Sequence, residues 1–498
     1  MGSPQREEAA HPVYYLLSTI YCLLSHPELA PTPRAFRRMP PFAARLTVPV
    51  ARDELFAWHE RPGAFERLSP PWQDVRVVHH TGGIRDGARV ALRVSLLGPA
   101  AFGWTLRHEG YVAGERFRDV QVDGPFARWV HTHSFERAGS AATLVDSIDY
   151  EPPFPLSLPG AASLFRAAFR PQLQRLFAYR HAVTAADLER HAQFAAEGPL
   201  RIAVSGATGL IGRQLCAYLT TGGHSVLRLV RPGPNLPAID DVAWNPDAGT
   251  IDAAALEGVD AVIHLAGEPV SERWSAEHKR AILHSRTAGT GLLARTLAAL
   301  ARPPRVFLSA SAVGYYGDGG DRPLDESSPR GADFLADVAA QWEAAAAPAA
   351  DRGIRVAHPR FGVVLSPRGG ALAKLLPPFR LGAGGKLGSG QQWMSWIALD
   401  DALGALEFLL FTESLAGPVN VTAPNPVTNE QFSHTLAHVL GRPALATVPP
   451  FALRLMFGEM ADAMLLAGQR ALPTALERAG FRFRHPDLDA ALRFELGL

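Results

Sequence analysis

Cysteine is nearly absent from this chain of 498 residues. Its two cysteines, Cys22 and Cys216, lie in unrelated segments, which excludes a disulfide framework and favours a reducing, cytoplasmic location. An excess of charge of either sign is also missing, because 49 Lys and Arg residues balance 48 Asp and Glu residues. This balance gives no reason to expect nucleic acid or an acidic membrane surface as a partner.

A long apolar run is missing as well. Val13 to Leu24 spans only about a dozen residues, which is too short for a transmembrane segment. Glu7 and Glu8 make it a poor signal peptide. Two interpretations of this N-terminal extension, residues 1–40, stay open: an interfacial or docking helix, or translation that starts at Met39 so that residues 1–38 are not made. We expect no transmembrane segment in the protein, and nothing in the sequence predicts an oligomeric state.

Residues 41–197 predict an antiparallel sheet followed by one long helix. Alternating apolar and polar residues start at Ala43, and Asp53 to His59 favours a short helix. Strands are then expected between Gly-rich or polar turns, at Val75–His80, Ala88–Leu97, Gly103–Tyr111, Arg116–Val122, Ala127–Glu136 and Thr143–Tyr150. A helix from Ala161 to Phe194 carries apolar residues at intervals of three and four. The sequence therefore predicts an α+β domain in which a curved sheet grips a helix.

This segment resembles the START-like, polyketide-cyclase-like helix-grip domains. The resemblance rests on Trp58-His59-x-x-Pro62-Gly63-Ala64-Phe65, on Gly124-Pro125-Phe126-x-x-Trp129 and on His131-x-His133. It implies a domain that encloses an apolar cavity, so that a hydrophobic ligand is one expectation. Trp58, Trp72, Phe126 and Trp129 would serve a core equally well, and a purely structural module is the other expectation.

His131 and His133 alternate on one face of a predicted strand. Two histidines without a cysteine or a matching pair of carboxylates make an incomplete ligand set for a metal ion. We therefore expect no metal here, and interpret both residues as polar rim or as hydrogen-bonded core.

A second domain is expected at residues 198–440, and it begins with a strand that runs into a glycine turn and a helix. Ile202 and Val204 suit a strand covered on both faces. Gly206, Gly209 and Gly212 permit a tight turn at the start of a helix, where the pyrophosphate of a dinucleotide can approach the backbone. The predicted cofactor-binding residues of this turn are Gly206, Thr208, Gly209, Leu210, Ile211 and Gly212.

The end of the next strand, Ser225 to Val230, predicts which dinucleotide is bound. A site for NAD(H) places Asp or Glu there, on the ribose hydroxyls. This chain has Arg228 and Arg231, and a guanidinium at that point can pair with a 2′-phosphate. NADP(H) is therefore favoured over NAD(H) as the cofactor. The alternative is that Arg231, beside Pro232 and Gly233, is a solvated loop residue.

Two further strands bring residues to the same edge of the predicted parallel sheet. The strand at Ala261–Gly267 ends in Leu265, Ala266 and Gly267, which are expected beside the cofactor's ribose, whereas its His264 is interpreted as a core histidine. The strand at Arg305–Ser311 ends in Ser309 and Ser311, whose hydroxyls are expected to face the crevice and to meet a carbonyl. Ser309 is also a predicted cofactor-binding residue.

Residues 200–498 resemble the extended short-chain dehydrogenase/reductases, and within them an atypical branch of NAD(P)-dependent epimerase-like proteins. The motifs that carry the resemblance are Ser309-x-Ser311-Ala-Val-Gly-Tyr315-Tyr316-Gly, Trp342-Glu343, Arg360-x-Gly362-Val-Val-Leu365 and Gly388-Ser-Gly-Gln391-x-Trp393-Met394-Ser395-Trp396. The resemblance implies an α/β fold, a Rossmann-type doubly wound parallel sheet with a small C-terminal helical domain at 441–498.

One departure from this family bears on the chemistry. The family's Tyr-x-x-x-Lys pair would fall at Leu335 and Ala339, so the lysine-activated phenol is missing. Ser311 is then the candidate hydrogen-bond donor to a carbonyl, Tyr316 the candidate acid, and Arg286 a cation near the nicotinamide or the phosphates. An ordinary surface role for Arg286 is the alternative.

Three functions stay open at this stage. The first is an NADP(H)-binding oxidoreductase or epimerase that acts on an apolar small molecule, and the second is a non-catalytic NADP(H)-dependent sensor. The third is a lipid-binding or small-molecule-binding protein. Lys374 to Ile397, rich in glycine and poor in charge, is either a loop that closes over substrate or an aromatic joint between domains.

Overall fold

The computed structural model describes residues 40–97, 100–152, 161–231 and 240–498. The residues fall into two compact units that divide between Leu188 and Glu189. The interfacial-helix and Met39 interpretations concern residues outside the described ranges. Within those ranges, no helix combines the length and the apolar character that a membrane crossing requires.

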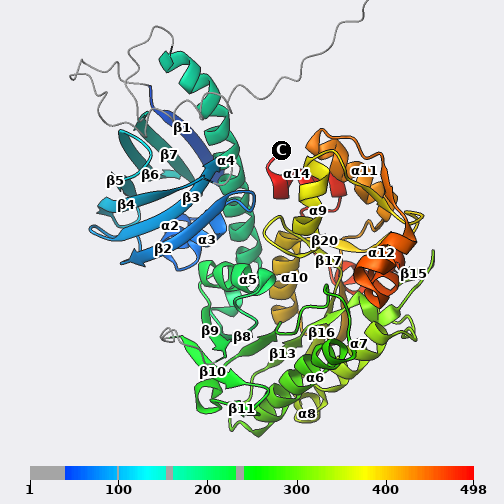
Figure 1. Cartoon of the computed structure of the whole chain (residues 1–498). Helices are drawn as coiled ribbons and strands as arrows, with labels where there is room; N and C mark the ends of the chain where they lie inside the picture. The colour runs from blue at the N-terminus through cyan, green and yellow to red at the C-terminus, as the bar shows by residue number, and fades with distance from the viewer. Residues whose placement is uncertain (1–39, 98–99, 153–160, 232–239) are drawn as a thin grey trace, which may run out of the picture. The chain divides into compact units, whose positions relative to one another are not determined.

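The first unit is a seven-stranded antiparallel sheet with helices α2 (Arg52–Glu60), α3 (Ala64–Leu68) and α4, which begins at Ala161 (Figure 1). The strand order is β1-β7-β6-β5-β4-β3-β2, so six strands form a meander and β1 closes beside β7. The bounds are β1 Phe42–Val48, β2 Asp74–Thr81, β3 Arg89–Leu97, β4 Ala100–Val112, β5 Arg116–Asp123, β6 Arg128–Ala138 and β7 Ala141–Glu151. The predicted helix-grip architecture is confirmed, with strand ends within about three residues of those expected.

The core of the first unit consists of two apolar clusters. One gathers Trp129, Ile148 and Phe177 with neighbouring aromatic residues, and the other gathers Trp58, Phe56 and Phe135. Trp58 is fully buried and Trp129 nearly so, which makes both of them core residues. Arg67 and Asp187 form a buried two-point ion pair, with N to O distances of 2.8 and 2.7 Å.

The second unit is built on a parallel sheet in the order β11-β10-β9-β8-β12-β13-β16-β14, with β21 paired to β16 and only β11 antiparallel. Its strands are β8 Arg201–Ser205, β9 Ser225–Val230, β10 Asp241–Asn245, β11 Thr250–Ile251, β12 Ala261–His264, β13 Val306–Ser309, β14 Ser311–Ala312, β16 Arg355–Phe361 and β21 Gly417–Val421. The chain leaves β8 toward β9 on one side and returns to β12 on the other. This reversal of strand order confirms the predicted doubly wound fold.

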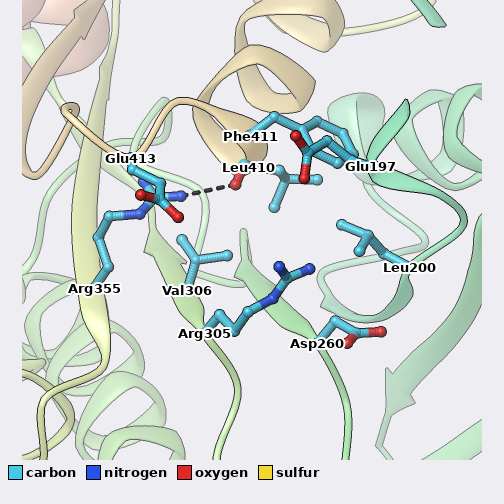
Figure 2. Close-up of a pocket in the computed structure, with 9 residues that line it drawn as sticks. All are labelled: Glu197, Leu200, Asp260, Arg305, Val306, Arg355, Leu410, Phe411 and Glu413. Carbon is cyan, nitrogen blue, oxygen red and sulfur yellow. Dashed lines mark hydrogen bonds between the residues drawn. The ribbon is translucent and has the colours of Figure 1, made fainter. Parts of the chain in front are cut away.

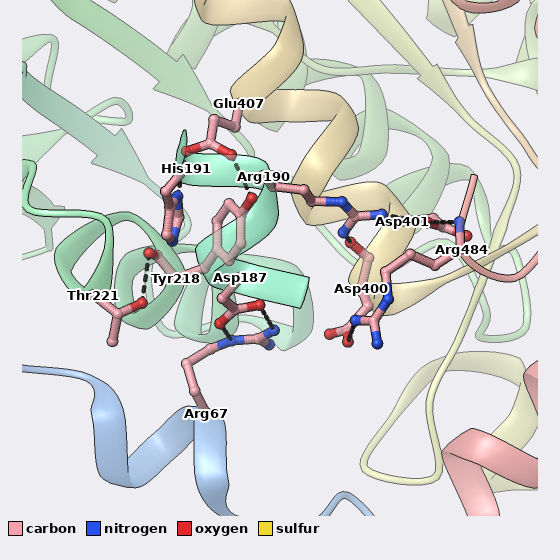
Figure 3. Close-up of polar contacts among 10 residues, drawn as sticks. All are labelled: Arg67, Asp187, Arg190, His191, Tyr218, Thr221, Asp400, Asp401, Glu407 and Arg484. Carbon is pink, nitrogen blue, oxygen red and sulfur yellow. Dashed lines mark hydrogen bonds and ion pairs between the residues drawn. The ribbon is translucent and has the colours of Figure 1, made fainter. Parts of the chain in front are cut away.

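Helices cover this sheet and extend it. They include α5 Leu210–Thr221, α6 Ala276–Ala299, α7 Phe334–Ala344 and α10 Leu399–Phe411. Within the second unit, the last turn of α4, which ends at Gln193, is held by α5 and α10 (Figure 3). Arg190 donates to Asp401 at 2.5 Å, while His191 and the Tyr218 hydroxyl both hydrogen-bond Glu407. Burial alone would raise the pKa of Glu407, but these partners outweigh burial and lower it.

Residues 370–498 contain more regular structure than the sequence suggested. Helix α9, Gly370–Arg380, occupies the start of the predicted Lys374–Ile397 loop, and the strands β18 Gly385–Leu387, β19 Trp393–Met394 and β20 Trp396–Ala398 follow. Phe379 and Trp396 are fully buried in an apolar cluster with residues of α11 (Asn429–Leu440) and α14 (Leu488–Leu496). For these two aromatics the structure supports the packing alternative over the closing loop.

Candidate functional site

The glycine turn lies between β8 and α5, at the carboxyl end of the first parallel strand. Gly206 has a left-handed backbone, with φ of +68°, and Gly209 occupies the position before the first residue of α5. Within the part of the chain that the structure describes, no side chain caps this helix end. Its first backbone N–H groups therefore have no partner within the helix and are available to an anion.

Two of the three glycines are required by close backbone packing. A Cβ on Gly212 would lie 2.1 Å from the Gly206 carbonyl oxygen, and a Cβ on Gly206 would lie 2.8 Å from the Leu265 carbonyl carbon. The turn is thus pressed against the end of β12. A Cβ on Gly209 would meet only the Gly206 oxygen, at 3.2 Å, and Thr208 and Gly209 are exposed. Leu210 and Ile211 are half-buried in the first helical turn.

The end of β9 carries two arginines in different environments. Arg228 pairs with Asp241 on the neighbouring strand β10, at 2.7 Å, so its charge is already compensated. Arg231 follows the last residue of β9 and is exposed. Of the two, Arg231 is the exposed one.

The end of β12 lies directly beside the glycine turn. His264 is fully buried and its Nδ1 lies 2.5 Å from the Ser205 hydroxyl on β8. Burial lowers the pKa of His264 to about 3, so the ring is neutral, as the interpretation as a core histidine requires. Leu265 and Ala266 are half-buried and Gly267 is exposed, so the backbone that follows β12 comes to the surface at the carboxyl end of the strand.

Arg286 comes from α6 and reaches the same edge. Its Nη1 donates to the carbonyl oxygens of Glu268 and Ile282, at 3.0 and 3.1 Å, and its guanidinium lies 5.0 Å from the Trp342 ring centroid. A Cβ on Gly267 would lie 3.3 Å from the Arg286 Cζ atom. Burial lowers the pKa of Arg286 to about 10. Arg286 is thus a partly buried cation next to the loop predicted to hold the ribose, rather than a solvated surface residue.

The two serines of the β13–β14 edge point into the protein. Ser309 is fully buried, and within the described residues its hydroxyl has no hydrogen-bond partner. Ser311 is 3% exposed and donates to Glu343 Oε1 of α7 at 2.7 Å. In this structure neither hydroxyl is directed to open solvent, so a substrate carbonyl would have to compete with Glu343 for the proton of Ser311.

An ion pair between the buried Arg360 and the part-buried Glu343 lies at this edge. Arg360 on β16 donates from Nε and Nη2 to the two oxygens of Glu343, at 2.7 and 2.8 Å, and from Nη1 to the Tyr316 hydroxyl at 3.0 Å. That hydroxyl in turn donates to Asn420 Oδ1 on β21 at 2.7 Å. Burial raises the pKa of Tyr316 to about 12, against the opposing effect of Arg360. Tyr316 therefore holds its proton firmly, which disfavours the predicted role as an acid.

The positions of the family's Tyr-x-x-x-Lys pair are apolar in the folded chain. Leu335 lies next to Gly314, and Ala339 is 3% exposed on the same helix. Leu335 packs in an apolar cluster with Trp274, Ile282 and Val338. No lysine-activated phenol can form at this point of α7.

Sequence reasoning did not assign roles to Glu343, Arg360 and Asn420. Glu343 and Arg360 both belong to motifs that carry the family resemblance, and this was the signal by which the sequence could have identified them. Their pairing depends on the neighbourhood of α7 and β16, which the order of residues along the chain does not reveal.

A separate pocket lies at the opposite edge of the parallel sheet (Figure 2). It has a volume of about 310 Å³, and its lining includes Leu200, Asp260 and Arg305, which precede β8, β12 and β13. Ligands of doubly wound folds bind at the carboxyl ends of the strands. This pocket at the amino ends is therefore not the predicted cofactor site.

Comparison with known families agrees with this division of the chain. Residues 202–421 match the NAD dependent epimerase/dehydratase family, and residues 48–177 match the polyketide cyclase/dehydrase and lipid transport family. Residues 448–495 match a domain of unknown function, DUF1731.

Individual relatives extend the comparison. The epimerase family protein Mb2239 of Mycobacterium bovis is 44% identical over 294 residues, which are 59% of this chain and 96% of that protein. A crystal structure of a nucleoside-diphosphate sugar epimerase from Corynebacterium glutamicum is 35% identical, with a TM-score of 0.75 and coverage of 92% of this chain and 90% of that one.

A human relative was solved with a cofactor. The crystal structure of human epimerase family protein SDR39U1 with NADPH is 35% identical, with a TM-score of 0.55, and the match covers 60% of this chain and 99% of that one. From the Rossmann sheet, its glycine turn and these relatives, we conclude that the chain belongs to the epimerase family and joins that NAD(P)-binding domain to a polyketide-cyclase-like one.

Proposed function

We propose that the protein is an NADP(H)-dependent oxidoreductase or epimerase that acts on a small, predominantly apolar molecule. The observation that carries the proposal is the uncapped start of α5, which follows the glycine turn at the reversal point of the sheet. The NADPH bound to the human relative is consistent with a dinucleotide at this turn.

The cofactor's pyrophosphate is proposed to lie against the backbone from Gly206 to Gly212. The helix start carries a partial positive charge, and its free N–H groups can donate to phosphate oxygens. Leu265, Ala266 and Gly267 would line the ribose through their backbone, because Ala266 and Gly267 have little or no side chain and Leu265 packs against the apolar core. Ser309 would contribute through the backbone alone, since its side chain is fully buried.

The preference for NADP(H) is proposed to depend on Arg231. Its guanidinium is exposed at the end of β9, where a 2′-phosphate would approach. Arg231→Asp should weaken NADPH binding more than NADH binding. Arg302→Asp is a matched control, because Arg302 is an exposed arginine that lies before β13, at the opposite edge of the sheet. Equal affinity for both cofactors in the unmodified protein would contradict this part of the proposal.

For catalysis, NADPH would supply a hydride, and this chain's residues would orient the acceptor carbonyl. Ser311 is proposed to donate a hydrogen bond to the carbonyl oxygen by turning away from Glu343. The two hydrogen bonds from Arg360 hold Glu343 in place when the Ser311 hydroxyl turns away from it. Tyr316 is the second proposed proton donor, and it would have to release Asn420 to act.

A non-catalytic NADP(H) sensor is the second candidate function. The apolar side chains at Leu335 and Ala339, together with the inward hydrogen bonds of Ser311 and Tyr316, favour it. A screen of carbonyl compounds that follows NADPH oxidation separates the two functions. Turnover that falls in Ser311→Ala supports the enzyme, and saturable NADPH binding without turnover of any compound supports the sensor. Failure to bind NADPH or NADH would contradict both functions.

A further inference from the structure

Eight titratable residues gather inside the first unit, between its two apolar clusters. They are Asp119 on β5, His131 and His133 on β6, Asp146 on β7, His108 on β4, His59 on α2, and Arg180 and His181 on α4. On β6 the two histidines stand between the core residues Trp129 and Phe135. Asp146 and both β6 histidines are less than 8% exposed. Burying such a polar layer in a core costs folding free energy unless its members hydrogen-bond one another or bind an ion.

Strand register brings these residues to one face of the sheet. Asp119 stands directly opposite His131, and His133 stands directly opposite Asp146. Side chains directly opposite each other in an antiparallel pair point to the same face. The carboxylates that seemed to be missing beside the two histidines are thus supplied by the neighbouring strands.

The distances from Asp119 Oδ2 to the two β6 histidines are longer than hydrogen bonds and close to those between two ligands of one metal ion. Its Oδ2 atom lies 3.6 Å from His131 Nδ1 and 3.7 Å from His133 Nε2. Both separations exceed hydrogen-bonding distance. Two ligands of a tetrahedral zinc ion, each about 2.0–2.1 Å from the metal, are about 3.3 Å apart. One atom from each of Asp119, His131 and His133 lies within 4.8 Å of the others. Small shifts of these side chains toward one another would let all three atoms bind the same metal ion.

The remaining atoms of the cluster form an outer layer around these three. Asp146 Oδ1 lies 3.0 Å from His131 Nε2 and 2.8 Å from His133 Nδ1, and Asp146 Oδ2 accepts from His181 Nε2 at 2.8 Å. His108 Nδ1 lies 2.8 Å from the second oxygen of Asp119. A histidine that binds a metal through one nitrogen typically directs the other to a carboxylate. Asp146 Oδ1 accepts such a hydrogen bond from His131 Nε2 and lies beside His133 Nδ1, which makes no hydrogen bond within the described residues.

We propose that Asp119 Oδ2, His131 Nδ1 and His133 Nε2 bind one divalent transition-metal ion, with Asp146 orienting both imidazoles. Two nitrogens and one carboxylate oxygen suit Zn²⁺ and related first-row ions, and they exclude a calcium-type set of oxygens. Three protein ligands leave a fourth position for water or for an atom of a ligand in the helix-grip domain. This site is independent of the NADP(H) site, since all its residues belong to the first unit.

The competing arrangement contains no metal, and hydrogen bonds alone hold the cluster together. Burial lowers the pKa of His133, but Asp119 and Asp146 outweigh it and raise that pKa to about 9. In that arrangement a proton on His133 takes the place of the ion. The two arrangements predict different metal contents: only the metal-binding one lets the folded chain retain a metal ion after purification and take one up when it is added.

The test uses the full chain without a histidine tag, first stripped with a chelator and then titrated with Zn²⁺ and with Co²⁺. We expect one equivalent of each ion per chain, a Co²⁺ absorption spectrum typical of four-coordination, and a rise in the melting temperature of the first unit. Asp119→Asn and His133→Gln should abolish stoichiometric uptake, and Asp146→Asn should weaken it by about 10-fold to 100-fold. His80→Gln, at an exposed histidine of β2, should bind like the unmodified chain.

Circular dichroism of each variant establishes that it is folded before uptake is compared. The absence of stoichiometric Zn²⁺ or Co²⁺ uptake by the folded, unmodified chain would overturn the proposal without reference to any variant. Uptake that survives in folded Asp119→Asn and His133→Gln would overturn it as well, because the ion would then be bound elsewhere.

Discussion

Replacing Gly212 with alanine tests the packing of the cofactor turn. Alanine is favoured over glycine within a helix by about 1 kcal/mol, so propensity alone predicts stabilisation. The added Cβ would however lie 2.1 Å from the Gly206 carbonyl oxygen and 2.9 Å from Ala207 Cα. These atoms belong to the backbone of the turn, which is itself pressed against β12, so they cannot move independently. Overpacking of this kind costs about 1–3 kcal/mol, and the contact to backbone favours the upper part of that range.

The net effect should be a loss of about 1–2 kcal/mol of unfolding free energy, together with a large loss of NADPH affinity. Gly289→Ala is the matched control, since Gly289 is a buried glycine inside α6 whose Cβ would meet nothing closer than 3.5 Å. Urea unfolding and NADPH fluorescence titration measure the two quantities. The reasoning is refuted if Gly212→Ala is as stable as Gly289→Ala and binds NADPH as tightly.

Three further predictions concern the polar groups around the site. Arg360→Met should destabilise the second unit by about 3 kcal/mol in urea unfolding, because it leaves the part-buried carboxylate of Glu343 with the Ser311 hydroxyl but without its cation. Addition of Glu343→Leu should recover part of the loss, and a further loss would contradict the ion-pair account. Tyr316, with its pKa raised to about 12 by burial, should contribute stability that is present below pH 10 and lost between about pH 10 and 12. Tyr316→Phe should reduce that alkaline slope in unfolding curves, and an unchanged slope would place the titration elsewhere. His264, with its pKa lowered to about 3 by burial, should contribute stability that is present above about pH 6.5 and lost on acidification toward pH 3. His264→Gln should flatten the acid side of the stability profile, and an identical profile would argue against a buried neutral ring.

Local pattern was sufficient to predict most elements of both units. Strand alternation identified the meander, and the order of strand, glycine turn and helix placed α5 and β9 correctly. These features depend on residues close together in the sequence, where periodicity and turn chemistry act directly.

The polar clusters could not be predicted, because their members meet only through register and helix placement. Asp119 reaches His131 across a strand pair, and Arg360 reaches Glu343 between a strand and a helix. For the same reason, the sequence could not show that Arg228 forms an ion pair with Asp241 or that the Ser311 hydroxyl donates to Glu343.

The location of the cofactor is the claim on which the proposed function depends, and hydrogen exchange with and without NADPH measures it directly. We predict that saturating NADPH slows exchange in the peptide that covers residues 206–221 and in the residues that follow β12. Saturable NADPH binding with no protection there, or with protection confined to the pocket around Arg305 and Asp260, would contradict the proposed site.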